Sequence, residues 1–290
     1  MPRQRPTAGR GARPPIDNDA PSDSDADSRE SIDSHTNYSG AVNLPAHQTK
    51  HLAELVYRFP SIDTSFRIVQ RNDTNSTGSS LWLSSQVLSS YLLHTYSKTS
   101  QTSTRNGDFK TRRRVLELGS GTGLLSLLMA RLGWQVTATD IAPVLDAVLR
   151  PNIDAGLYQL VHAGMADADQ VHVCELDWTT PPATWHPHHQ ASFQLIVTAD
   201  TIYEASLVRP LLSTLAHLYH RQADSHPSIL LALERRDPTH VTEALRMASE
   251  EFGLAFKQVP AKRVRKMFDT LGDGATWSRD DWEGVEIWKL

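Results

Sequence analysis

The stretch from Val115 to Asp140 constrains the fold more than any other part of the chain. It begins with a short apolar run of the kind that forms a strand buried on both faces. Three glycines within five residues follow this run, at Gly119, Gly121 and Gly123. An apolar helical stretch and a second strand then lead to Asp140. This order of strand, loop, helix and strand predicts two neighbouring parallel strands of an α/β sheet.

The glycine-rich loop predicts a nucleoside site at the carboxyl edge of this sheet. Glycine lets the backbone approach a ligand closely, and ligands of open α/β sheets bind beyond the carboxyl ends of the strands. Asp140 lies where a carboxylate can accept both hydroxyls of a ribose. The spacing G-x-G-x-G, with Leu124 where a dinucleotide fold wants glycine, favours S-adenosylmethionine over NAD. The sulfonium and amino group of this donor are cationic, so Glu117 is suited to help orient its amino acid end. A βαβ unit whose glycines serve only the turn is the alternative.

Length, charge and cysteine content narrow the class of protein. The chain has 290 residues, a formal charge of −4 and one cysteine, Cys174. This length suits one α/β domain with extensions, and the charge argues against wholesale binding of nucleic acid. A single cysteine excludes an intrachain disulfide framework and fits a reducing compartment. The sequence has neither a membrane-spanning apolar run nor the apolar core of a secretory signal. We therefore expect a monomer located in the cytoplasm, the nucleus or both.

Composition divides the chain into a tail and one domain. Residues 1–49 are first basic and proline-rich, then acidic and serine-rich. They carry too little apolar surface to offset chain entropy, so they predict a disordered tail. Residues 50–290 predict a single domain with a strand and helix extension ahead of its first core strand. Within this domain, residues 97–111 are polar and predict a flexible linker.

The succession of elements predicts an α/β fold: a Rossmann-like, mostly parallel sheet of seven strands with helices on both faces. Residues 81–96 have the apolar spacing of an amphipathic helix. Residues 66–71 suit a strand or one half of a hairpin. The last two strands should form an antiparallel hairpin at the C-terminal end. The strands expected after the first two are 171–178, 193–199, 229–233, 254–259 and 285–288.

Proline and glycine mark where several helices should begin and end. Pro151 should kink or end the helix that starts near Pro143, and Gly156 or Gly164 should end the whole segment. Asp237 followed by proline is a good N-cap and first residue for a later helix.

Several motifs in order resemble one known family. They are a G-x-x-x-W-x-x-S pattern at residues 78–85, ELGSGTG at 117–123, Asp140, LDW at 176–178 and DTIY at 200–203. With them, the chain resembles the class I, seven-strand S-adenosylmethionine-dependent methyltransferases over residues 78–290. Within that class it is similar to the non-histone protein-lysine methyltransferases of the methyltransferase-like group called family 16. The runs LALERRD and GVEIWKL further suggest the branch with the Kin17-type lysine methyltransferases.

The resemblance implies which residues contact the donor and the acceptor. Asp200 and Tyr203 are the expected catalytic pair, because both follow the fourth strand and can turn toward the donor methyl. Asp177 and Trp178 are expected to border the adenine. No metal is expected. The full set of residues expected to bind the donor is Trp82, Glu117, Gly119, Gly121, Gly123, Asp140, Asp177, Trp178 and Ala199.

Methyl transfer to lysine sets the tasks of the catalytic pair. A neutral amine must be held about 3 Å from the methyl carbon with water excluded. Lysine is normally protonated, so the site must lower its pKa or accept its proton. The carboxylate of Asp200 can bind the incoming ammonium, and the phenol of Tyr203 can help orient the lone pair. As alternatives, Asp200 caps the next helix, Tyr203 packs in the core, and Trp82 is a core aromatic.

Two polar clusters receive structural interpretations. His186, His188 and His189 lie in a proline-rich loop without the four regularly spaced ligands of structural zinc, so we expect a solvated loop. The basic residues between Lys262 and Lys266 can contact an acidic partner or nucleic acid, but an ordinary charged surface is the simpler interpretation.

The leading hypothesis is an S-adenosylmethionine-dependent protein-lysine methyltransferase with a protein as its substrate. A small-molecule or nucleic-acid methyltransferase on the same fold is the second hypothesis, because fold does not determine substrate. The nucleic-acid option lacks an Asn-Pro-Pro-Tyr base pocket after the fourth strand. A non-catalytic binding module and an NAD-dependent oxidoreductase are the remaining alternatives.

Overall fold

The fold is given by a computed structural model that describes residues 43–71, 77–103, 112–222, 225–271 and 277–290. The chain divides into two units, residues 1–41 and 42–290, and the described residues all belong to the second. Most of the predicted tail, residues 1–42, lies outside the described part. Residues 43–49 are ordered instead of belonging to a tail: they include a short helix, α1 (Ala46–Thr49), and the side chain of Ala46 is fully buried.

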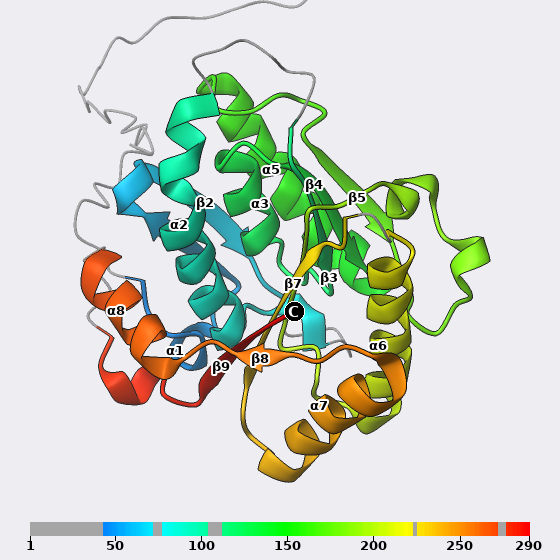
Figure 1. The fold of residues 1–290 in the computed structure, drawn as a ribbon. Helices are drawn as coiled ribbons and strands as arrows, with labels where there is room; N and C mark the ends of the chain where they lie inside the picture. The colour runs from blue at the N-terminus through cyan, green and yellow to red at the C-terminus, as the bar shows by residue number, and fades with distance from the viewer. Residues whose placement is uncertain (1–42, 72–76, 104–111, 223–224, 272–276) are drawn as a thin grey trace, which may run out of the picture. The chain divides into compact units, whose positions relative to one another are not determined.

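A seven-strand sheet forms the centre of the domain (Figure 1). Its strand order is β5-β4-β3-β6-β7-β9-β8. The first five strands in this order run parallel, whereas β9 pairs antiparallel with both β7 and β8. This confirms the predicted fold class, including the antiparallel C-terminal pair. The strands are β3 (Arg114–Leu118), β4 (Gln135–Asp140), β5 (Val171–Glu175), β6 (Leu195–Ala199), β7 (Ser228–Glu234), β8 (Lys257–Gln258) and β9 (Val285–Lys289).

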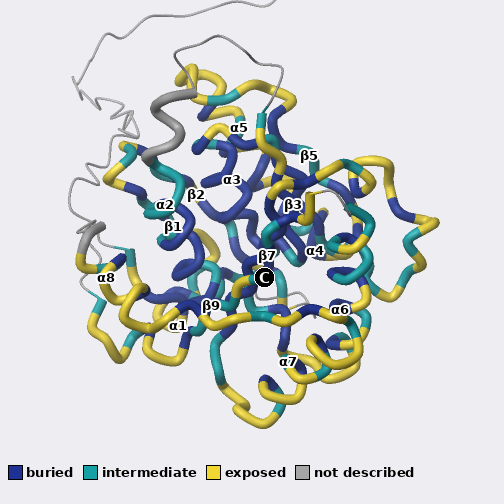
Figure 2. The backbone as a smooth tube through the Cα atoms, viewed as in Figure 1, coloured by how far each residue is buried: buried dark blue, intermediate teal, exposed yellow. Residues whose placement is uncertain are grey.

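Helices cover both faces of the sheet and bury two separate apolar cores. Helices α2, α3 and α5 contribute to the core on one face, and α6 and α7 to the core on the other. The central strands of the sheet are buried, while the outer surfaces of the helices are exposed (Figure 2). The longer helices are α2 (Leu83–Ser103), α3 (Leu124–Arg131), α5 (Arg150–His162), α6 (Ala205–His220), α7 (Pro238–Phe252) and α8 (Ala261–Leu271).

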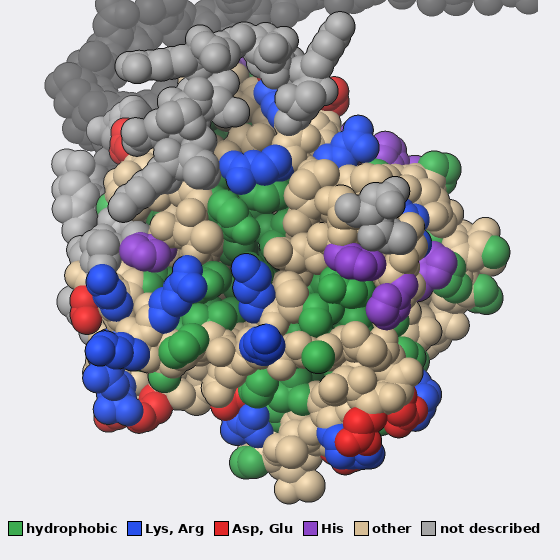
Figure 3. All heavy atoms as spheres, in the orientation of Figure 1, with side chains coloured by type: hydrophobic (Ala, Val, Ile, Leu, Met, Phe, Trp, Pro, Cys, Tyr) green, Lys and Arg blue, Asp and Glu red, His purple; other side chains and the backbone are tan. Residues whose placement is uncertain are grey.

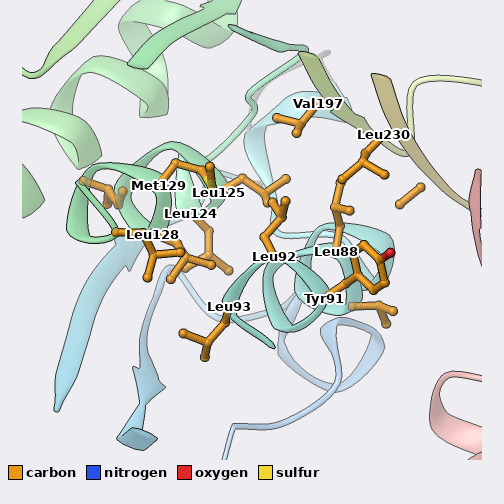
Figure 4. Close-up of a cluster of buried hydrophobic side chains, with 14 of the residues drawn as sticks. Leu88, Tyr91, Leu92, Leu93, Leu124, Leu125, Leu128, Met129, Val197 and Leu230 are labelled. Carbon is orange, nitrogen blue, oxygen red and sulfur yellow. The ribbon is translucent and has the colours of Figure 1, made fainter. Parts of the chain in front are cut away.

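The helix ahead of the first core strand packs directly on the glycine-loop helix. Figure 4 shows α2 side chains, including Leu88 and Leu92, facing α3 side chains such as Leu124 and Leu128. All four of these leucines are completely buried. This packing places the N-terminal end of α2 beside the glycine loop that precedes α3.

An antiparallel hairpin stands apart from the main sheet. Its strands are β1 (Glu54–Phe59) and β2 (Thr64–Val69), and they form a sheet of their own. The hairpin confirms the prediction made from residues 66–71. It packs against α5 and α3, where Asn152 accepts a hydrogen bond from the Val69 amide and donates one to the Val69 carbonyl.

Two predicted boundaries differ from the structure. Helix α2 continues to Ser103, so residues 97–103 are helical instead of linker, and residues 104–111 lie outside the described part. Pro151 follows a π-helical turn (Leu145–Leu149) that connects the short helix α4 (Ala142–Val144) to α5. A proline has no N–H for the helical ladder, and the wider π turn accommodates this without ending the helix. Gly164, with φ +66°, follows the end of α5, whereas Gly156 lies inside it.

One predicted helix cap is confirmed, and one helix was not predicted. The Asp237 carboxylate accepts hydrogen bonds from the Thr239 and His240 amides, as expected of an N-cap. Helix α8 was not predicted, because its buried positions are few and basic residues surround them. Val264 and Met267 face the core, while Lys and Arg side chains gather over α8 at the surface (Figure 3).

Candidate active site

A cavity of about 540 Å³ opens at the carboxyl edge of the sheet. Its walls come from the ends of β3, β4, β5 and β6, from the glycine loop and from the start of α2. This volume is in the range of small-molecule and cofactor sites. All the predicted site residues line the cavity except Gly123. Gly123 lies instead at the start of α3, where a Cβ would come within 3.0 Å of Leu149 and Ile153.

The loop between β3 and α3 is built so that only glycine fits at two positions. Gly119 has φ +66° and Gly121 has φ +53°, a region that side-chain-bearing residues rarely adopt. A Cβ at Gly119 would lie 2.8 Å from Thr201 Cγ2, and a Cβ at Gly121 would lie 2.9 Å from the Gly78 carbonyl oxygen. The glycines therefore let the loop pass close to its neighbours and keep the cavity floor open.

Asp140 is held against this loop at the end of β4. Its Oδ2 accepts a hydrogen bond from the Gly121 amide at 2.8 Å, and its Oδ1 accepts one from the Ile141 amide at 2.8 Å. Burial raises the pKa of Asp140 to about 6, although these two backbone donors act to lower it. A carboxylate has about four acceptor positions. Asp140 can therefore still accept ribose hydroxyls while it fixes the loop.

Glu117 is the most deeply buried acid of the cavity, with 2% of its surface exposed. One of its carboxylate oxygens accepts a hydrogen bond from the Ser126 hydroxyl of α3. Burial raises the pKa of Glu117 to about 8, with a smaller contribution in the same direction from the charge of Asp140. The folded chain consequently holds Glu117 mainly protonated at neutral pH. A cationic ligand beside it would favour the ionised form.

Asp177 and Trp178 form the wall beyond β5. Asp177 Oδ1 accepts hydrogen bonds from the Thr179 amide at 2.8 Å and the Thr179 hydroxyl at 2.7 Å, which fixes the turn. The indole of Trp178 lies against Gly119, and its buried Nε1–H has no hydrogen-bond partner among the described residues. An unpaired buried donor in a cavity wall is suited to a ligand acceptor. The flat face and this donor together fit an adenine.

Asp200 occupies the opposite corner, directly after β6. It adopts φ +59°, and its side chain is 6% exposed. Arg236 donates a hydrogen bond from Nη2 to Asp200 Oδ2 at 2.8 Å. Burial raises the pKa of Asp200, while the charge of Arg236 acts to lower it. Glu204 caps α6, so Asp200 is not the helix cap that the sequence left open.

Tyr203 and Trp82 line the cavity rather than belonging to the core. Tyr203 is 46% exposed, which excludes the core-packing alternative. Trp82 immediately precedes α2 and donates from Nε1 to the Thr77 carbonyl at 2.8 Å. Two cations lie near its ring: Lys50 Nζ at 3.3 Å from the ring centroid and the Arg236 guanidinium carbon at 4.7 Å.

Sequence reasoning missed two functional candidates, Lys50 and Arg236. Arg236 had a detectable signal, because it closely follows β7 and so lies at the same carboxyl edge as Asp200. Lys50 had no such signal, because it is the first residue of the predicted domain and belongs to none of the motifs. Its contact with Trp82 joins residues far apart in sequence.

The histidine-rich loop is only partly solvated. His188 stacks between His172 and His186, with ring centroids 4.1 and 4.8 Å apart. His189 is 1% exposed, so the prediction of a solvated loop is wrong for this residue. Figure 3 shows several histidine side chains on the right of this face of the molecule and another on its left. Within the described ranges, no three His, Cys, Asp or Glu side chains are arranged to hold a metal ion.

A mostly parallel seven-strand sheet with this glycine loop and these acids defines a class I, Rossmann-like methyltransferase fold. The chain belongs to the lysine methyltransferase family, whose family model matches residues 62–252.

Named relatives are similar to part of the chain. A mouse (Mus musculus) EEF1A lysine methyltransferase 3 is 30% identical over 132 residues, which cover 46% of this chain and 49% of the relative. A zebrafish (Danio rerio) protein N-lysine methyltransferase METTL21A is 36% identical over 106 residues, covering 37% and 44%. The chain spans about half the length of the curated relatives it matches. A solved SAM-dependent methyltransferase from Agrobacterium tumefaciens has a TM-score of 0.44 and 14% identity, covering 82% of this chain and 69% of that one.

Proposed function

We propose that this chain transfers the methyl group of S-adenosylmethionine to a lysine side chain of a non-histone protein. Membership of the lysine methyltransferase family supports the reaction class. The observation that carries the proposal is the cavity itself, which gathers Glu117, Asp140 and Asp200 at one edge of the sheet. The relatives that bear the words protein-lysine methyltransferase in their names support a protein acceptor.

The residues present fit an S-adenosylmethionine molecule. Glu117 would face the ammonium of its amino acid end, Asp140 its ribose hydroxyls, and Trp178 its adenine. The unpaired indole N–H of Trp178 and the close approach of the backbone at Gly119 and Gly121 are the features that favour this ligand. When bound, the donor supplies an electrophilic methyl group on a sulfonium.

The chain's own contribution to methyl transfer is to hold the acceptor amine and exclude water. Asp200 offers a carboxylate to the incoming ammonium, and Arg236 orients that carboxylate and acts to lower its pKa. Tyr203, exposed at the mouth of the cavity, offers a phenol to the amine. The proton of the acceptor leaves to water, because no other described side chain is required to take it.

Labelled donor and a cell lysate test the proposal. The wild-type chain should place label on a protein band that survives ribonuclease and is lost with protease. Asp200→Asn should abolish the label, and it is a cleaner change than alanine because asparagine tolerates the left-handed backbone of this position. Label confined to small molecules or to RNA would contradict a protein acceptor.

We also propose that the protein acts as a monomer in the cytoplasm or the nucleus. In the part of the chain that the structure describes, no helix has the length and apolar character to cross a membrane. Sedimentation of the purified protein would test the monomer, and imaging of a tagged chain would test the compartment. Assignment to the Kin17-type branch stays a prediction.

A further inference from the structure

Lys50, at the start of the domain, contacts a residue that lines the cavity. Its ammonium lies 3.3 Å from the centroid of the Trp82 ring, and Trp82 is part of the cavity wall. An ammonium over the face of an indole is a stabilising cation–π contact. Arg236, on the same ring at 4.7 Å, links this contact to the Asp200 carboxylate. Lys50 therefore shares its surroundings with the corner where an acceptor amine is expected.

The backbone around Lys50 is fixed by a buried amide side chain. Gln70 donates from Nε2 to the carbonyls of Thr49 and Leu52, each at 2.9 Å. Its Oε1 accepts a hydrogen bond from the Leu81 amide at 2.7 Å. One side chain thus ties the turn that carries Lys50 to the residue before Trp82. These hydrogen bonds hold the backbone next to Lys50 close to the residue before Trp82.

The electrostatic surroundings of Lys50 favour a nucleophilic amine. Burial lowers the pKa of Lys50, and the nearby charge of Arg236 lowers it further. The charges of Asp200 and Glu234 act to raise the pKa, so they offset part of this lowering. A lysine must lose its proton before it can attack a methyl carbon, so these surroundings are those that an acceptor needs.

We infer that Lys50 is an internal methyl acceptor of the cavity, because its amine contacts Trp82, a residue of the cavity wall. The inference rests on the proposed function. The neutral amine of Lys50 forms a bond to the methyl carbon of S-adenosylmethionine as the carbon–sulfur bond breaks. The electron pair of that bond goes to sulfur, which becomes a neutral thioether, and the methylated ammonium releases a proton to water. The corner of the cavity at Asp200 would then serve both the methylation of Lys50 and the entry of lysines from other proteins.

The placement of Lys50 can be tested before any donor is added. In a protein labelled with ¹³C-lysine, the ε-methylene protons of Lys50 should be shifted upfield by the ring current of Trp82. Lys50→Arg identifies the signal by its disappearance. Lys257→Arg, which changes an exposed lysine on β8, should leave it in place. A Lys50 signal at the position of a solvent-exposed lysine would overturn the inference.

The methyl transfer is tested by incubating the full chain with S-adenosylmethionine and analysing residue 50. A parallel assay measures transfer of label to the proteins of a lysate. Mass spectrometry should find methyl groups on residue 50 of the wild type and of Lys257→Arg, and none at this position in Lys50→Arg. The fraction methylated per unit time should not depend on protein concentration. A rate per chain that rises with concentration would overturn the internal step. Label in lysate proteins with residue 50 unmodified would overturn the inference and leave the proposed function standing, whereas absence of label everywhere would reject both.

Discussion

Arg236 donates a hydrogen bond to the carboxylate of Asp200 at 2.8 Å, across the cavity corner between β6 and β7. The acid is nearly buried, while 43% of the arginine side chain is exposed. Two segments that are distant in sequence therefore supply one charge pair at the carboxyl edge of the sheet. The charge of Arg236 acts to lower the pKa of Asp200 in a place where burial raises it.

Removal of the Arg236 side chain should slow methyl transfer, because Asp200 would be protonated more readily. In Arg236→Ala the pKa of Asp200 should rise further, so the acidic limb of the pH–rate profile should move to higher pH. The chain should also lose about 1–2 kcal/mol of stability, a modest amount because the arginine is partly solvated. Arg236→Lys should restore part of the rate. Arg209→Ala, which breaks an exposed pair with Glu251, is the control and should change neither property appreciably. An unchanged profile in Arg236→Ala would contradict this role.

Donor binding should release protons near neutral pH. Glu117 has a pKa of about 8 in the unliganded fold and is mostly protonated at pH 7, whereas a cationic donor favours its carboxylate. Titration calorimetry in two buffers of different ionisation enthalpy should therefore report release of up to about one proton per donor at pH 7. The release should fade as the pH rises above 8. Glu117→Gln should bind the donor without this release, and proton release equal to that of the wild type would argue against Glu117 as its source.

Donor affinity should weaken in acid because of Asp140. Its pKa of about 6 means that the carboxylate needed for the ribose hydroxyls is lost as the pH falls through 6. The folded pKa is above the ordinary value, so protonation of this residue favours the folded chain, and acid weakens binding here without weakening the fold. Asp140→Asn should bind the donor roughly 10- to 100-fold more weakly at pH 7. It should also lose the part of the pH dependence that is due to Asp140 and keep the part that is due to Glu117, and a profile equal to that of the wild type would assign the step near pH 6 to another group.

Gly121 should not tolerate substitution by any other residue, not even alanine. An alanine at this position would be strained by the positive φ, and its Cβ would lie 2.9 Å from the Gly78 carbonyl oxygen. We expect Gly121→Ala to cost about 1–3 kcal/mol in urea unfolding and to abolish donor binding. Gly164→Ala is the matched control, because it has φ +66° but nothing within 4 Å of the added atom. Equal effects of the two changes would show that backbone strain, and not the close approach, limits this loop.

His189 should make the fold sensitive to acid. Burial lowers its pKa to about 4, so it is held neutral in the folded chain and is protonated on unfolding below about pH 6.5. Stability should therefore fall as the pH drops from about 6.5 to 4, by up to about 3 kcal/mol from this residue. His189→Leu should flatten the dependence in urea unfolding at pH 7 and pH 5. His51→Gln, at an exposed position, should leave the dependence as in the wild type.

The sheet and its cavity were predictable because the signals that encode them are local. The glycine loop, Asp140 and the cap at Asp237 each depend on neighbours within one or two elements of sequence. The partners of the site residues were not predictable in the same way. The position of Arg236 after β7 places it at the same edge as Asp200 but does not specify their ion pair, and nothing in the order of residues brings Lys50 to Trp82.

Two of the expectations that the structure corrects have a similar physical origin. A run of prolines and histidines is usually hydrated, and only the packing of Trp185 and α6 around the loop encloses His189. The polar composition of residues 97–103 masks a helix that simply continues from α2. In both cases tertiary packing or helix propagation outweighed the local composition.

The side-chain amide of Asn152 links its own helix, α5, to the hairpin and to the glycine loop. It exchanges two hydrogen bonds with Val69 at the end of the hairpin and donates a third to the Thr122 carbonyl of the glycine loop. A ligand that stiffens the loop therefore also restrains the hairpin strand, although the strand touches no part of the ligand. The Val69 amide becomes a built-in reporter of occupancy, whose exchange with deuterated solvent slows when the cavity is filled.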